Sequence, residues 1–215
     1  MIPAIDPEAD YRALVRRSYD ACAEVYEESR RTEPGIEIQG LVDRLEDGAA
    51  VLDIGCGSGV PIAKALAERY RVTGVDVSEE MVRRARENVP AGEFICNDVM
   101  SVDFEPSSFD AVVAFYSVFH LPRAEHPALF RRIHDWLRPG GYLLCTLSHG
   151  SEAGYTEPDF HGVTMYWSNF GLGEYLEILP AAGFEVLETS STGAGWRDPV
   201  LAESEDHPLV MARRG

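Results

Sequence analysis

Lysine is almost absent from this chain, because Lys64 is the only one among 215 residues. Arginine does not balance the acidic residues, since the chain has 36 aspartates and glutamates but only 19 lysines and arginines. The formal net charge is therefore −17. Nucleic-acid binding draws most of its affinity from clustered lysine and arginine side chains. The composition therefore argues against a nucleic-acid partner, and we interpret the acidic surface as a source of solubility.

Long apolar runs and a secretion signal are also missing from the sequence. No run approaches the roughly 20 residues that span a bilayer, and the first residues have neither the basic nor the apolar region of a signal peptide. The four cysteines form no C-x-x-C pair. Free thiols are typical of reducing compartments, so we expect a cytoplasmic protein with no membrane partner.

A glycine-rich turn follows the first strongly apolar segment. Residues 51–59 read Val-Leu-Asp-Ile-Gly-Cys-Gly-Ser-Gly, and Asp76 ends a second apolar segment 17 residues later. Glycine lets the backbone approach a ligand closely, and a later acidic side chain can accept hydrogen bonds from a ribose diol. A helix expected to start near Val60 would direct free N–H groups into the same space. Together these features predict a nucleoside site.

The order of the expected elements predicts an α/β fold. Strands are expected near residues 50–54, 71–76, 93–97, 110–115 and 141–148, and helices near residues 60–69, 79–88 and 125–137. This alternation indicates a doubly wound, mostly parallel sheet. A helix at 171–182 and an antiparallel pair of strands at 184–189 and 209–213 would complete seven strands.

We expect one domain from the length and the apolar content. Residues 1–45 would form an N-terminal helical cap within it, with helices at 11–31 and 36–45, and residues 46–215 would form the cofactor-binding core. Residues 149–170, rich in glycine, aromatic and acidic residues, interrupt the rhythm after the fifth strand. We interpret them either as a substrate lid or as an ordinary connecting loop.

The glycine turn, Asp-x-Gly-x-Gly-x-Gly, resembles motif I of the class I S-adenosylmethionine-dependent methyltransferases. Gly57 and Gly59 are two residues apart, whereas a dinucleotide fingerprint separates its second and third glycines by three. Residues 75–78 with Met81, and residues 94–99, 109–115 and 137–144, resemble later motifs of the family in the same order. The resemblance extends from about residue 18 to residue 213 and indicates the small-molecule branch, with a seven-stranded Rossmann-like fold.

The resemblance implies S-adenosylmethionine as the cofactor and suggests its contacts. The methionine part would lie beside Asp53, Gly55, Gly57 and Gly59, the ribose beside Asp76, and the adenine beside Asp98 and Val99. The other predicted cofactor contacts are Tyr19, Tyr26, Cys56, Val77, Met81, Asn97 and Phe115. Tyr19 and Tyr26 lie two helical turns apart and share a face, which favours either a lid over the cofactor or a packed aromatic stripe.

His120 is the leading candidate for a general base. It follows the fourth strand by five residues, and an unperturbed pKa near 6.5 suits proton transfer, although a histidine among aromatic residues can equally be structural. The predicted substrate contacts are Tyr116, Phe119, Tyr155, Tyr166 and Trp167. Methyl transfer from a sulfonium depends mainly on alignment and needs a base only when the nucleophile loses a proton.

Signatures that are missing narrow the substrate. The Asn/Asp-Pro-Pro-Tyr/Phe motif of base and amide methylation is replaced by Phe-Tyr-Ser-Val at 115–118, and no Pro-Cys occurs. His149, Asp159 and His161 match no metal-site spacing, so no metal is expected. We expect methyl transfer to an O, N or C atom of a small apolar or aromatic metabolite.

Two other functions stay open on the sequence alone. The first is a cofactor-binding module without catalysis that serves a partner protein. The second is a nicotinamide-dependent oxidoreductase, which the short glycine spacing and the lack of a Tyr-x-x-x-Lys motif disfavour.

Overall fold

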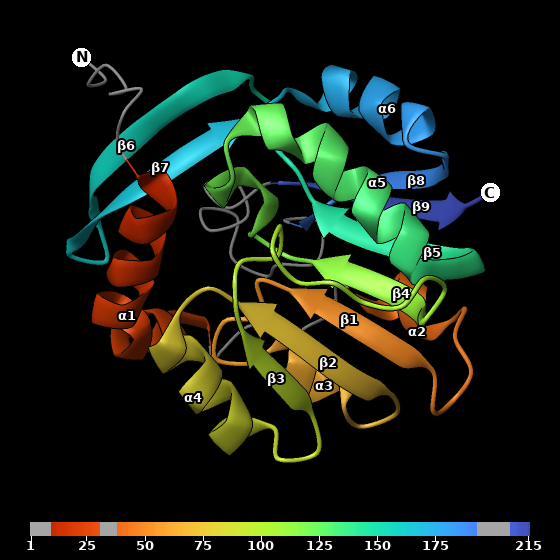
Figure 1. The fold of residues 1–215 in the computed structure, drawn as a ribbon, viewed down its shortest axis with the longest axis horizontal. Helices are drawn as coiled ribbons and strands as arrows, with labels where there is room; N and C mark the ends of the chain where they lie inside the picture. Colours follow the sequence, from red (N-terminus) through yellow and green to blue (C-terminus); the bar gives the residue numbers. More distant parts are fainter. Residues whose placement is uncertain (1–9, 31–37, 193–206) are drawn as a thin grey trace.

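The computed structural model describes residues 10–30, 38–192 and 207–215. Its centre is a seven-stranded sheet in the order β3-β2-β1-β4-β5-β9-β8, and β6 and β7 form a separate two-stranded sheet (Figure 1). The strands are β1 (Ala50–Ile54), β2 (Arg71–Asp76), β3 (Glu93–Cys96), β4 (Phe109–Ala114), β5 (Leu137–Thr146), β6 (Glu152–Phe160), β7 (Val163–Asn169), β8 (Phe184–Ser191) and β9 (Pro208–Arg214). The helices are α1 (Tyr11–Arg30), α2 (Gln39–Val42), α3 (Ile62–Leu66), α4 (Glu79–Asn88), α5 (His126–Trp136) and α6 (Leu172–Ala181), with 3-10 turns η2 (Val118–His120) and η3 (Arg123–Glu125).

The pairing of the strands confirms the predicted Rossmann-like fold. Strands β1 to β5 run parallel, and β9 runs antiparallel between β5 and β8. Strand order reverses between β1 and β4, because β1 pairs with β2 on one side and with β4 on the other. Ligands of open α/β sheets bind beyond the carboxyl ends of the strands at such a point.

Helices cover both faces of the large sheet, and the side chains of each strand divide between them. Leu52 and Ile54 pack in one apolar cluster with α5 and α6, whereas Val51 packs in a second cluster with α2, α3 and α4. Because strand side chains alternate between faces, a sheet covered on both sides needs strands that are apolar throughout. This requirement explains why the central strands β1 and β4 could be predicted as apolar runs.

Several element boundaries differ from the predicted ones. Helix α3 begins at Ile62 rather than near Val60 and is only five residues long, so it is shorter than the helix predicted near residues 60–69. Strand β5 begins at Leu137, because the Arg-Pro-Gly-Gly segment already belongs to it. Helix α2 begins at Gln39 and covers only four residues, and residues 36–37 of the predicted helix lie outside the described residues.

Residues 149–170 contain a β-hairpin rather than an unstructured segment. Phe160 pairs with Val163 across a two-residue turn, in which His161 and Gly162 have φ of 49° and 82°. Two positive φ values in succession are the signature of a type I′ turn, which suits the twist of paired strands. The hairpin packs against α1 and forms the upper left wall of the molecule in Figure 1.

Helix α1 lies across the carboxyl ends of the parallel strands, between the hairpin and α4 (Figure 1). Its Ser18 hydroxyl donates to the Thr164 carbonyl of β7 at 2.6 Å, and Val15 packs with Met165 and Tyr166. The predicted N-terminal helix is therefore present as a cover over the strand ends. Among the described residues, no helix is long and apolar enough to cross a membrane.

Candidate functional site

A pocket lies beneath α1 at the carboxyl ends of β1, β2, β3 and β4, and it has a volume of about 790 Å³ including its open mouth. Twelve residues singled out from the sequence line it: Tyr19, Tyr26, Gly55, Gly57, Asp76, Val77, Asn97, Asp98, Val99, Phe115, Tyr116 and His120. These residues come from α1, from four strand ends and from η2. The fold thus brings together side chains that are far apart in the chain.

The other eight predicted site residues lie outside this lining. Asp53 and Met81 are buried at 2% and 0% exposure, and Cys56 belongs to the apolar cluster on the α3 side of the sheet. Gly59 lies against Ala85 and Val89 of the α4 region. Behind His120, and apart from the lining, are Phe119, Tyr166 and Trp167, with Tyr155 opposite Trp167 in the hairpin.

The absence of a side chain matters at two glycines of the turn, for different reasons. Gly55 has φ of 70°, and a Cβ added there would lie 2.3 Å from Cβ of Ser117, so the turn and the segment after β4 fit closely together. Gly57 has φ of 52°, and a Cβ added there would meet no atom within 4 Å. The Gly57 backbone therefore borders the open space of the pocket directly.

Asp76 holds the glycine turn in place while facing the pocket. Its Oδ2 accepts from the Gly57 N–H at 2.9 Å, and its Oδ1 accepts from the Ser78 N–H at 2.9 Å. Burial raises the pKa of this carboxyl, and the two backbone hydrogen bonds oppose that rise. Because each carboxylate oxygen has two lone pairs, Asp76 can still accept hydrogen bonds from a ligand hydroxyl.

Arg12 closes the β3 end of the pocket, and it was not among the residues predicted from the sequence. Its guanidinium donates to Asp98 at the end of β3 and to Glu125 of η3, so it joins α1 to two distant segments. The second Asp98 oxygen accepts from the Met100 N–H at 2.8 Å. No motif marks a contact between residues 86 positions apart, and only the path of α1 across the strand ends creates it.

Tyr19 and His120 form a hydrogen-bonded pair at the pocket wall. The distance from Tyr19 Oη to His120 Nε2 is 2.7 Å, and that from His120 Nδ1 to the Tyr166 carbonyl oxygen is 2.9 Å. A carbonyl oxygen only accepts, so Nδ1 carries the proton. Burial lowers the pKa of His120 to about 4, and the neutral ring therefore accepts at Nε2 from the Tyr19 hydroxyl.

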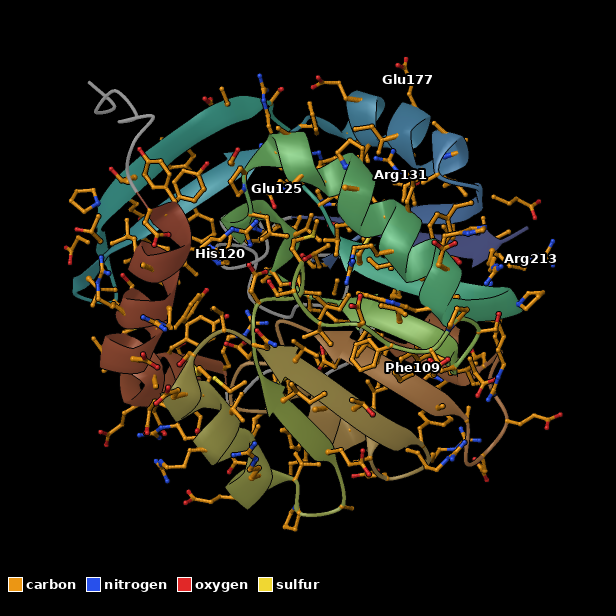
Figure 2. The ribbon with its side chains drawn as sticks, in the orientation of Figure 1. Phe109, His120, Glu125, Arg131, Glu177 and Arg213 are labelled. Atoms are coloured by element: carbon orange, nitrogen blue, oxygen red, sulfur yellow. The ribbon has the colours of Figure 1, made fainter. Side chains whose placement is uncertain are left out.

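Aromatic rings surround this pair on the side away from the glycine turn. His120 lies between α1 and the strand ends (Figure 2), 4.5 Å from the Trp167 ring and 5.4 Å from the Phe119 ring, centroid to centroid. Tyr26 and Phe160 extend the cluster toward the hairpin tip. The pocket thus has a polar half beside β2 and β3 and an aromatic half beside α1, the end of β4 and η2, with the hairpin rings behind His120.

The remaining lining residues were not predicted from the sequence. They are Arg12, Val15, Ile54, Val75, Ser117, Val118, Leu121 and Leu129. Ile54, Val75 and Ser117 directly adjoin predicted residues, so their position at strand ends was the available signal. Among the described residues, no group of three or more His, Cys, Asp or Glu side chains is arranged to hold a metal ion.

This geometry agrees with the comparison to known proteins. Residues 51–141 match the family described as a methyltransferase domain. A trans-aconitate 2-methyltransferase from Deinococcus radiodurans is 30% identical over 195 residues, which cover 84% of this chain and 70% of that protein. The chain belongs to the class I S-adenosylmethionine-dependent methyltransferase family. The cofactor of this family, and of this chain, is S-adenosylmethionine.

Other relatives differ in length or share the fold alone. A 2-methyl-6-phytyl-1,4-hydroquinone methyltransferase from Synechocystis is 34% identical over 176 residues, which cover 75% of this chain and 54% of that protein. The chain spans about half the length of several such curated relatives. The solved 1,6-didemethyltoxoflavin-N1-methyltransferase of Burkholderia thailandensis, with S-adenosylhomocysteine bound, has a TM-score of 0.74 at 22% identity and covers 99% of this chain and 93% of its own.

Proposed function

We propose that this protein transfers a methyl group from S-adenosylmethionine to an O, N or C nucleophile of a small, apolar or aromatic acceptor. The hydrogen bond between Tyr19 and His120 at the pocket wall is the observation that supports the chemistry on the acceptor side. S-adenosylmethionine, when bound, supplies a methyl group on a positively charged sulfur that departs as a neutral thioether. The protein's task is therefore to align the acceptor, exclude water and receive a proton.

The polar half of the pocket fits the cofactor. We propose that Asp98, Asn97 and Val99 contact the adenine and that Asp76 accepts from the ribose. The methionine part would then lie along Gly55 and Gly57, where an added Cβ at Gly57 meets open space. The strand order β3-β2-β1-β4 supports this direction, because it places the three subsites in sequence at neighbouring strand ends.

The aromatic half of the pocket fits an uncharged acceptor. Arg12 is the one arginine or lysine in the described lining, and it is already bonded to two carboxylates. Burial keeps His120 neutral at physiological pH. Tyr26, Tyr116 and Phe115 line the pocket with rings, which favours a flat apolar molecule. The Arg30 guanidinium lies over the Tyr26 and Tyr116 rings, and Arg30 is not itself part of the described lining.

Tyr19 can carry the proton from the acceptor to His120. As the new bond to the methyl carbon forms, the acceptor proton would pass to Tyr19 Oη, and the tyrosine proton would pass to His120 Nε2. The Tyr166 carbonyl would keep the ring oriented, because it holds the Nδ1 proton throughout. A weak base suffices for an oxygen acceptor, since a protonated ether is strongly acidic; an amine acceptor reacts as its neutral form and keeps or loses its proton to water.

The test measures release of S-adenosylhomocysteine with a panel of phenols, amines and enols. His120→Ala is expected to reduce turnover by about 100-fold or more, the usual contribution of a general base. Tyr19→Phe, which keeps the ring and removes only the hydroxyl, is expected to reduce it in the same direction. Cofactor affinity of His120→Ala measured by calorimetry should stay within about twofold, because this change leaves the polar half of the pocket intact.

His134→Ala on α5 is the matched control, because it removes a histidine that lies outside the pocket lining. Persistent turnover in His120→Ala would exclude His120 as the base. A wild-type protein that binds the cofactor but methylates no acceptor of the panel would favour the alternative, a binding module that serves a partner protein.

A further inference from the structure

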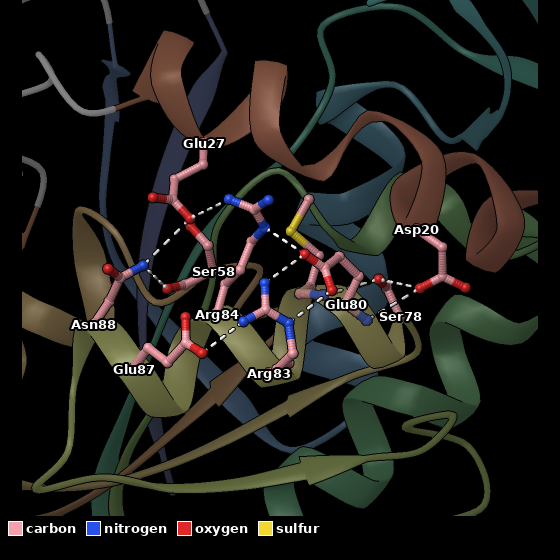
Figure 3. A network of polar contacts seen from close by, with 10 residues as sticks. Asp20, Glu27, Ser58, Ser78, Glu80, Arg83, Arg84, Glu87 and Asn88 are labelled. Carbon is pink, nitrogen blue, oxygen red and sulfur yellow. Dashed lines mark hydrogen bonds and ion pairs between the residues drawn. The ribbon is translucent and has the colours of Figure 1, made fainter.

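Helix α1 presents two faces to the rest of the molecule, and a tyrosine–acid pair occurs twice along it. Tyr19 and Tyr26 line the pocket, whereas the residues directly after them, Asp20 and Glu27, bond to α4 or its N-terminal cap (Figure 3). Neighbouring helix residues point about 100° apart. A single rotation of α1 therefore decides where both tyrosines and both acids point.

Asp20 is bound to the N-terminus of α4. Its Oδ1 accepts from the Ser78 hydroxyl at 2.7 Å and from the Glu80 N–H at 3.2 Å. Ser78 is itself the N-cap of α4, since its Oγ accepts from the Met81 N–H at 3.1 Å. The first N–H groups of a helix lack internal partners and favour negative charge, so Asp20 supplies a second cap from a different helix.

Glu27 holds the other end of the same interface. It is only 3% exposed and accepts from Asn88 Nδ2 at 3.3 Å and from Arg84 at 3.5 Å. Asn88 also donates to the Ser58 carbonyl at 3.0 Å, which belongs to the glycine turn (Figure 3). Glu27 follows Asp20 by seven residues, about 10 Å along the helix, so the two contacts fix both position and rotation.

The Asp20 contact continues to the pocket. The Ser78 N–H donates to Asp76 Oδ1 at 2.9 Å, while the Ser78 hydroxyl donates to Asp20. One serine thus joins the helix that covers the site to the carboxylate that faces it. Asp20 itself does not line the pocket.

We infer that Asp20 and Glu27 are positioning residues that set the rotation of α1, so that the Tyr19 hydroxyl meets His120. How Tyr19 and His120 act on an acceptor rests on the proposed function, but the positioning of Tyr19 by Asp20 and Glu27 does not. Ser18 and Arg12 hold the N-terminal half of α1 against β7, Asp98 and Glu125. Without the Asp20 contact, the stretch of α1 that carries Tyr19 loses its bond to α4, and the distance between Tyr19 and His120 is less tightly fixed.

The protonation state of His120 reports on the position of α1, because Asp20 does not contact His120 and can affect it only through the helix. Tyr19 from α1, the Tyr166 carbonyl and the Trp167 ring from β7 surround His120, and burial lowers its pKa to about 4. In Asp20→Ala, a displaced α1 admits water and withdraws the donor from Nε2. Both changes favour the protonated ring, so the pKa of His120, followed by NMR of the ring, is expected to rise by about one unit or more.

Two variants serve as controls. Asp20→Asn keeps an acceptor oxygen for Ser78 and Glu80, and is expected to restore the wild-type His120 pKa to within about 0.3 units. Glu24→Ala removes an exposed carboxylate from the same helix and is expected to change nothing. Alanine is the strongest helix former, so Asp20→Ala should fold, which its melting temperature checks.

An unchanged His120 pKa in folded Asp20→Ala would overturn the inference, as would an equal rise in Glu24→Ala. Neither result depends on turnover, so methyl transfer as the proposed function would stand. Conversely, a wild-type protein that does not bind S-adenosylmethionine, together with a raised His120 pKa in Asp20→Ala, would overturn the proposed function and keep the positioning role.

Discussion

Asp53 is a carboxyl group at the carboxyl end of β1, and only 2% of it is exposed. Burial, and secondarily the charge of Asp76, raise its pKa to about 7. The same group in the unfolded chain has a pKa of about 3.9. Between these two values the folded state holds the proton more tightly, so Asp53 contributes most stability at low pH, and this contribution is lost as pH rises toward 7.

Asp53→Asn should therefore raise the melting temperature more at pH 8 than at pH 5. The amide has the same shape and never ionises. It therefore removes the cost of burying an ionised carboxylate in the folded state, which is at most about 4 kcal/mol. Thermal melts of the variant and the wild type at both pH values measure the difference. Asp159→Asn, at an exposed position of the hairpin, is the control. An equal change at the two pH values would contradict the raised pKa.

The sequence predicted the polar half of the pocket better than the aromatic half. Asp76, Asn97 and Asp98 end apolar strands, and parallel strands must bring their carboxyl ends to one edge. Arg12 and Ser117 were missed for different reasons: Arg12 reaches the site only through the course of α1, while Ser117 carries no motif. The bond between Tyr19 and His120 joins residues 101 positions apart, and no spacing rule reports such a contact.

At the scale of elements, apolar content decided which strands could be predicted. The central strands β1 and β4 are buried on both faces and appear as apolar runs. Strand β6 is mostly exposed and has no apolar run or clear alternation. The turn between β6 and β7 contains His161 and Gly162 instead of the Asn-Gly pair that marks a type I′ hairpin. The signal available in the sequence was Gly162 directly before the segment Val163–Asn169, which indicates a turn followed by a strand.

A buried hydrogen bond also joins α5 to α6. His126 is fully buried, with Nε2 3.0 Å from the Leu121 carbonyl oxygen and Nδ1 2.9 Å from Tyr175 Oη. The carbonyl accepts, so Nε2 carries the proton and Nδ1 accepts from the tyrosine hydroxyl. Burial lowers the pKa of His126 to about 4, which keeps this arrangement neutral.

Tyr175→Phe is expected to lower the free energy of unfolding by about 1–3 kcal/mol, because it leaves the buried Nδ1 without a donor. For a chain of this length, each kcal/mol corresponds to about 2–4 °C of melting temperature. Tyr142→Phe on β5 removes a hydroxyl from a partly exposed ring and is the matched control. Equal melting temperatures for Tyr175→Phe and the wild type would show that the hydroxyl adds no stability.

At the scale of the whole molecule, the pocket joins parts of the chain that no single element connects. Helix α1, four strand ends and η2 all line it, so a ligand bound there contacts several elements that are far apart in the chain. A ligand that binds only the folded state stabilises it according to its concentration relative to Kd. Stabilisation by a ligand thus reports directly on the identity of the cofactor.

S-adenosylmethionine at about 100 times its Kd is expected to stabilise the protein by about 2.7 kcal/mol. Asp76→Ala should weaken its binding by about 1.5–3 kcal/mol, the range for hydrogen bonds to a charged group. Thermal-shift titration with S-adenosylmethionine, S-adenosylhomocysteine and NAD, followed by calorimetry, tests both statements. A shift with NAD alone would contradict the cofactor, and unchanged affinity in Asp76→Ala would mean that the ribose lies elsewhere.

Within the described part of the chain, β6 and β7 form a two-stranded sheet of their own and pair with no strand of the seven-stranded sheet. This hairpin nevertheless supplies the Tyr166 carbonyl and the Trp167 ring to the surroundings of His120. Mutations that accumulate in this hairpin during evolution can therefore remodel the surroundings of His120, where we propose that the acceptor binds, while leaving the strand ends around Asp76 intact. Descendants of one ancestral gene could in this way diversify their substrates and inherit a single donor site unchanged.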